Sequence, residues 1–138
     1  MLKLLYGNGV CMSATSPPRN TDVLVVGAGP TGLVLALWLT RLGVRIRIVD
    51  KTEGPGTTSR AVAVQARTLE LYSQMGLAKE VVARGLRASA ANLWVAGSRV
   101  AHAVFGALGA GLSPFPYLLL FPQDEHERAL GEALAARG

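Results

Sequence analysis

The feature that most constrains this chain is a glycine pattern that directly follows a short apolar segment. Residues 22–27 predict a buried strand, because they are mostly β-branched and carry no charge after the first position. Gly27, Gly29 and Gly32 follow in the spacing G-x-G-x-x-G, and the apolar residues after them predict a helix over 30–42. This order of strand, tight turn and helix is the context in which the pattern indicates a phosphate-binding turn.

Each glycine of the turn is expected to have its own physical role. Gly27 permits the tight turn, Gly29 has no Cβ and lets a pyrophosphate approach the backbone, and Gly32 lets the helix pack closely on the strand. The helix N-terminus offers unpaired N–H groups and a partial positive charge to phosphates. Pro30 suits this first turn, where a missing N–H costs nothing. The turn is therefore suited to binding an anion.

A second predicted strand, over 44–50, ends in an acidic residue. Its apolar residues alternate with arginines, which is typical of a strand covered on one face. Asp50 lies 18 residues after Gly32, where a carboxylate can accept hydrogen bonds from the hydroxyls of an adenosine ribose. A glycine-rich turn without a ligand would explain the glycines but not Asp50. The pattern therefore favours an adenine dinucleotide site.

Composition limits the other classes of function. The 138 residues amount to one domain, and half of them are hydrophobic. The single cysteine excludes an intrachain disulfide and a cysteine metal cluster. His102 and His126 lie far apart in the sequence without metal-ligand spacing, so we expect no metal site.

Charge and hydropathy predict neither a nucleic-acid nor a membrane partner. The net charge is +5, but the arginines are scattered and form no run or stripe. The longest apolar run, over 33–39, is too short to span a bilayer. We therefore expect a cytoplasmic protein. The pattern does not predict its oligomeric state.

The rest of the chain reads as connections and further elements around this unit. Residues 1–20 are expected to form a flexible N-terminal extension. Trp38 and Leu42 are predicted to pack on the sheet. The loop over 51–60 leaves the ligand-binding edge of the sheet, so Arg60 could reach a phosphate or could equally be a solvated arginine. The remaining expectations are an extended piece at 61–64, helices at 66–75 and 77–84, a hairpin of strands 88–96 and 99–105 turning at 97–98, a strand at 117–121, and a helix from 122.

Four stretches together resemble a known family. They are 25–33 (VVGAGPTGL), 48–51 (IVDK), 59–71 (SRAVAVQARTLEL) and 121–130 (FPQDEHERAL). In these residues the chain resembles the N-terminal part of the FAD-dependent aromatic hydroxylases, the group-A flavoprotein monooxygenases of the p-hydroxybenzoate hydroxylase type. It is more similar to the branch that acts on phenols and polyketides. Many members have Glu where this chain has Asp50, a mild departure.

The resemblance implies an α/β fold. It would be the N-terminal βαβ of a Rossmann-like FAD-binding domain of the glutathione-reductase type, plus a short antiparallel β segment. Residues 21–138 would then form a partial FAD-binding domain, with 87–121 contributing strands toward a substrate domain. The family's middle Asp-Gly motif, its later Gly-Asp motif and its substrate sheet are absent from this sequence. We therefore expect the chain to be roughly the first third of an enzyme.

The resemblance also implies the chemistry and the site. The family reduces FAD with NADPH or NADH and uses O₂ to hydroxylate an electron-rich aromatic ring. Glycines of the turn would line the FAD pyrophosphate, Asp50 would bind the ribose, and Arg60 would meet the phosphates. Arg67 and Arg128 would be secondary contacts or members of structural ion pairs. No catalytic residue is implied within this chain, and the cofactor-binding residues carried over are Gly27, Gly29, Pro30, Thr31, Gly32, Asp50, Lys51, Arg60, Ala61 and Gln123.

Two alternatives remain open. Another FAD-dependent oxidoreductase, such as an amine oxidase or a reductase, would share the first βαβ, although the stretches at 60–71 and 122–130 argue against it. The chain could also be a catalytically silent dinucleotide-binding remnant or the truncated product of such a gene.

Overall fold

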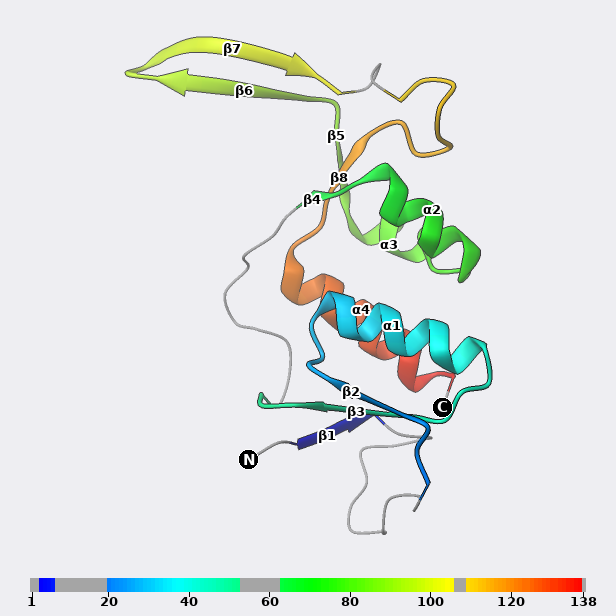
Figure 1. Cartoon of the computed structure of the whole chain (residues 1–138). Coiled ribbons are helices and arrows are strands. Elements are labelled where there is room, and N and C mark those ends of the chain that lie inside the picture. The colour runs from blue at the N-terminus through cyan, green and yellow to red at the C-terminus, as the bar shows by residue number, and fades with distance from the viewer. Residues whose placement is uncertain (1–2, 7–19, 53–62, 106–108, 138) are drawn as a thin grey trace. The chain divides into compact units, whose positions relative to one another are not determined.

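The computed structural model describes residues 3–6, 20–52, 63–105 and 109–137. The chain divides into two compact units, which Figure 1 shows. The first unit contains residues 1–59 and 123–138, and the second contains residues 60–122. The predicted mixed α/β architecture is confirmed. The predicted domain limits, 1–20 and 21–138 with strands from 87–121, stay predictions.

The sheet of the first unit is built around one parallel pair of strands. Strands β2 (Val23–Val26) and β3 (Ile46–Asp50) run parallel, with Val25 opposite Ile48, and helix α1 (Pro30–Arg41) connects them. The predicted βαβ unit is therefore present. Strand β1 (Lys3–Tyr6), which the sequence did not lead us to expect, pairs antiparallel with β3 and gives the order β1-β3-β2.

Two helices that are far apart in the sequence lie side by side in this unit (Figure 1). Helix α4 (Gln123–Ala135) packs against α1. Each helix has buried apolar residues: Leu33, Ala36 and Leu37 on α1, and Ala129, Leu130 and Leu134 on α4. This packing brings the start of α4 toward the glycine turn at the start of α1.

One predicted core residue of α1 is not in the core. Leu42 is 71% exposed, so its predicted packing on the sheet is wrong. The helix ends at Arg41, and Leu42 is the C-cap residue, beyond the face that α1 buries. Trp38 is half-buried, and the guanidinium of Arg41 lies 6.0 Å from its ring centroid.

The second unit has a small antiparallel sheet covered by two helices. Its elements are β4 (Ala63–Val64), α2 (Ala66–Gln74), α3 (Ala78–Arg84), β5 (Leu86–Ala88) and β8 (Leu118–Leu120). The strands lie in the order β4-β8-β5, and Leu119 of β8 is fully buried. On α2, burial of Tyr72 raises the pKa of its phenol to about 12.

The predicted hairpin is formed by β6 (Ala90–Val95) and β7 (Ser98–Val104), as Figure 1 shows. Its turn lies at Ala96-Gly97, one residue earlier than predicted. Both residues have positive φ, 48° and 78°, which is the requirement of the type I′ turn that matches the twist of paired strands. The Gly97-Ser98 pair is typical of a turn, but Ser98 is the first residue of β7 and pairs with Val95.

Candidate functional site

The glycine turn connects the carboxyl end of β2 to the first turn of α1. Gly27 has φ +107°, a backbone conformation that side chains disfavour. Its N–H donates to the Val49 carbonyl oxygen at 2.8 Å, so the turn begins while the chain is still bound to β3. Gly29 is the N-cap residue, and its carbonyl oxygen accepts from the Leu33 N–H at 3.0 Å. The N-terminus of α1 therefore opens at the carboxyl edge of the sheet.

The other two glycines differ in the space around them. A Cβ on Gly32 would lie 2.0 Å from the carbonyl oxygen of Gly27, a separation that no methyl group can occupy. Among the residues that the structure describes, a Cβ on Gly29 would have only the Glu127 Oε1 atom within 4 Å, at 3.9 Å. The missing side chain at Gly32 thus lets the helix contact the strand, whereas the missing side chain at Gly29 leaves the backbone there accessible.

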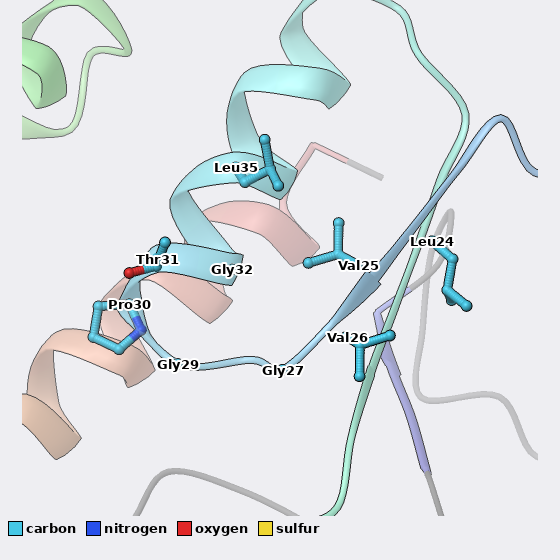
Figure 2. Close-up of a pocket in the computed structure, with 9 residues that line it drawn as sticks. All are labelled: Leu24, Val25, Val26, Gly27, Gly29, Pro30, Thr31, Gly32 and Leu35. Carbon is cyan, nitrogen blue, oxygen red and sulfur yellow. The ribbon is translucent and has the colours of Figure 1, made fainter.

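A pocket lies along the turn (Figure 2). Figure 2 shows Gly27 and Gly29 as bare backbone between the end of β2 and the start of α1, with Pro30, Thr31 and Gly32 on the first helical turn. The pocket has a volume of about 440 Å³ and is open to solvent. It is lined by Leu24, Val25, Val26, Gly27, Gly29, Pro30, Thr31, Gly32 and Leu35.

Asp50 connects the end of β3 to the glycine turn. Its Oδ2 atom accepts a hydrogen bond from the Ala28 N–H at 2.6 Å, and its Oδ1 atom accepts from the Thr52 N–H and hydroxyl, both at 2.8 Å. The Ala28 hydrogen bond, and then that of the Thr52 N–H, hold the pKa of Asp50 below its ordinary value. The carboxylate is therefore ionised at neutral pH and lies beside the turn, as predicted, but it also stabilises the turn itself.

The start of α4 adds a second acidic residue at the turn. Gln123 Nε2 donates to Glu127 Oε1 at 2.8 Å, and that same oxygen faces Gly29. Glu127 is only 9% exposed. Glu127 is not among the predicted site residues. The feature of the sequence that could have indicated it is its i, i+4 spacing from Gln123, on a helix whose neighbouring residues Ala129 and Leu130 form an apolar face.

The structure describes some of the other predicted site residues but not all of them. Lys51 is exposed at the end of β3, and Arg60 and Ala61 lie outside the described residues. Arg67 pairs with Glu70 at 2.8 Å within the second unit, and Arg128 pairs with Glu125 on α4. Both arginines thus have the structural ion pairs that were one of the two interpretations.

The part of the chain that the structure describes has neither a cluster of metal ligands nor a helix suited to a membrane. No three His, Cys, Asp or Glu side chains gather there as a metal ion would require. Among the same residues, no helix is both long and apolar enough to cross a bilayer.

The donors and acceptors of the turn fit an adenine dinucleotide. The N-terminus of α1 supplies N–H groups and positive potential for a pyrophosphate, and Gly29 leaves its backbone open. The Asp50 carboxylate is an acceptor suited to sugar hydroxyls.

Comparison with known proteins agrees with this geometry. The pattern of a protein family described as "FAD binding domain" matches residues 20–138. The chain is 43% identical over 126 residues to 6-methylpretetramide 4-monooxygenase of Streptomyces rimosus, which covers 88% of this chain and 22% of that protein.

Solved structures give the same result. The p-nitrophenol 4-monooxygenase of Pseudomonas putida DLL-E4 is similar with a TM-score of 0.77 and 29% identity, over 84% of this chain and 29% of that one. A complex of aklavinone-11 hydroxylase with FAD and aklavinone has a TM-score of 0.76 and 30% identity, over 89% of this chain and 25% of that one. The chain therefore spans less than a third of the length of these relatives.

The contrast between the two glycines predicts their substitutions. We expect Gly32→Ala to destabilise the full-length protein by about 1–3 kcal/mol, because the helix must move away from the turn. Gly29→Ala is the matched control and should change stability by less than about 1 kcal/mol. Thermal denaturation of the two variants measures this difference. Equal effects would contradict the close approach at Gly32.

The hydrogen bonds of Asp50 predict a pH dependence. Because folding lowers the pKa of Asp50 below its ordinary 3.8, the ionised carboxylate stabilises the fold above that value, and the contribution is lost as pH falls through the lower, folded-state pKa. Asp50→Asn should therefore unfold at a lower temperature than the wild type between about pH 5 and 7, and the gap should narrow below about pH 4. Melting temperatures across this range test it. A gap that does not narrow as pH falls below 3.8 would refute the assignment.

Proposed function

This chain belongs to the family of FAD binding domains that includes aromatic and polyketide monooxygenases, and from that premise we propose that it forms the FAD-binding part of a NAD(P)H-dependent aromatic hydroxylase. The observation that carries the proposal is the open backbone at Gly29, placed at the N-terminus of α1 and next to the Asp50 carboxylate. FAD, when bound, supplies the redox chemistry that the side chains of this chain cannot perform.

Different residues at and beside the glycine turn would bind different parts of FAD. We infer that the pyrophosphate lies against Gly27, Gly29 and Gly32, with the Thr31 hydroxyl and Pro30 at the helix start. Asp50 would accept hydrogen bonds from the adenosine ribose, with Lys51 beside it. Gln123 would contact the cofactor from α4. Arg60 and Ala61 would complete the site, with Arg60 on the phosphates.

The substrate class is inferred from the relatives. Their names give 6-methylpretetramide, p-nitrophenol and aklavinone, so we propose an aromatic small molecule, phenolic or polyketide, as the substrate and O₂ as the second reactant. We propose NADPH or NADH as the reductant, because the resemblance implies it. A cytoplasmic location fits a protein that uses these soluble cofactors and stays a prediction.

The test of this function uses the full-length protein as its host produces it. The bound flavin is released and identified by its absorbance and mass. NADPH and NADH consumption is then followed with a panel of phenols and polycyclic aromatic polyketides. We expect one substrate to accelerate consumption and to gain one oxygen atom in its mass. Bound FAD without any oxygenated product would instead support a silent FAD-binding protein, and a flavin-free protein that binds no FAD would refute the proposal.

The role of Asp50 gives a sharper prediction. Asp50→Ala should raise the dissociation constant of FAD by roughly 10- to 150-fold, because it removes charge-assisted hydrogen bonds worth roughly 1.5–3 kcal/mol. Titration of the apoprotein by flavin fluorescence measures the constant. Asp22→Ala is the matched control, since Asp22 begins the same βαβ unit but pairs with Arg45. Unchanged affinity in Asp50→Ala would refute the ribose contact.

A further inference from the structure

We propose that Glu127 is a positioning residue of the FAD site, which orients the carboxamide of Gln123 and supports the turn at Gly29. The inference rests on the proposed function, because it assigns Glu127 a part in binding FAD. It stands on three observations: the hydrogen bond between the two side chains, the burial of the Glu127 carboxylate, and its place against the glycine turn.

The hydrogen bond decides which way the carboxamide of Gln123 faces. An ionised carboxylate only accepts hydrogen bonds, whereas a carboxamide has a donating NH₂ end and an accepting oxygen end. Glu127 Oε1 therefore holds the NH₂ end of Gln123, at 2.8 Å. The carbonyl oxygen of Gln123 is turned away from Glu127, and this end suits the hydroxyl of a sugar or a ribityl chain. A phosphate oxygen, which only accepts, does not suit it.

Burial makes this orientation rigid. Glu127 is 9% exposed, whereas Glu132, on the same helix, is exposed. A carboxylate in such a place requires hydrogen-bond donors, since burying a charge without them is costly. Its helix, α4, packs against α1, and both Leu130 of α4 and Leu33 of α1 are buried. A side chain already held in one orientation loses less entropy when a ligand arrives.

The position of Glu127 also connects α4 to the glycine turn. Its Oε1 atom is 3.9 Å from the place of a Cβ on Gly29, the N-cap of α1. Negative charge is stabilising at a helix N-terminus. The same oxygen thus lies beside the turn that would receive the pyrophosphate and accepts a hydrogen bond from the side chain that would contact a hydroxyl group. One carboxylate can therefore fix the relative placement of two contacts to FAD.

The experiment is a double-mutant cycle on the full-length protein, with Gln123→Ala, Glu127→Ala and the double variant. The dissociation constant of FAD is measured by fluorescence titration of each apoprotein. We expect Glu127→Ala to weaken binding by about three- to tenfold, as the loss of one oriented hydrogen bond would. In the Gln123→Ala background the same change should have less than about a twofold effect, because there is no carboxamide left to orient and only the support of the turn remains. Equal effects in both backgrounds would overturn the positioning role.

Two further variants separate orientation from folding. Glu127→Gln keeps the volume and one hydrogen bond but accepts either end of Gln123, so it should weaken FAD binding while its apoprotein melts within about 2 °C of the wild type. Glu132→Gln is the matched control for charge on α4 and should bind FAD as the wild type does. Wild-type affinity in Glu127→Gln would overturn the orientation. A wild-type protein that binds no FAD would overturn the proposed function itself, and this inference with it.

Discussion

The site depends on how closely α1 approaches β2. The two elements touch where Gly32 faces the carbonyl oxygen of Gly27, and only a hydrogen atom fits between them. This contact sets where the N-terminus of α1 points, and so where its unpaired N–H groups can meet a ligand. Interiors are close-packed, so such a contact cannot be relaxed without moving the helix. The arrangement of Gly29, Pro30 and Thr31 follows from it.

The charged groups beside the glycine turn have a structural role as well as the proposed role in binding FAD. The N-terminus of α1 carries a partial positive charge, and two carboxylates lie beside it, Asp50 from β3 and Glu127 from α4. Asp50 already accepts the Ala28 N–H, so it stabilises the turn before any ribose is present. In the proposed site, FAD would therefore add its hydrogen bonds to a carboxylate that already has partners. Such a preformed site reduces the entropy lost on binding.

The sequence predicted the parts of the site that depend on local geometry. The spacing of Gly27, Gly29 and Gly32 and the place of Asp50 follow from short-range rules of turn and strand, and each could be derived before the fold was known. The prediction for Leu42 is wrong because the helix ends at Arg41, three residues after Trp38, and such an end is decided by capping, which periodicity does not reveal.

Two other features depend on contacts that local patterns do not encode. Strand β1 pairs with β3 across a long stretch of sequence, and its composition alone did not distinguish it from a flexible lead-in. Glu127 reads as one more acidic residue at the start of a helix, where acids are common for the sake of the dipole. Its burial at Gly29 follows only from the packing of α4 on α1.

This packing explains why the unit is continuous in space but not in sequence. Residues 60–122 form a separate compact unit, and the chain then returns to place α4 beside α1. The glycine turn and Gln123 are thus joined by a helix–helix interface of buried leucines and alanines, and the polar contact of Glu127 lies at its end. Apolar burial supplies the stability of such an interface, while a buried polar pair fixes its register. In the proposed site, the positions of two contacts to FAD would therefore depend on side chains that do not touch it.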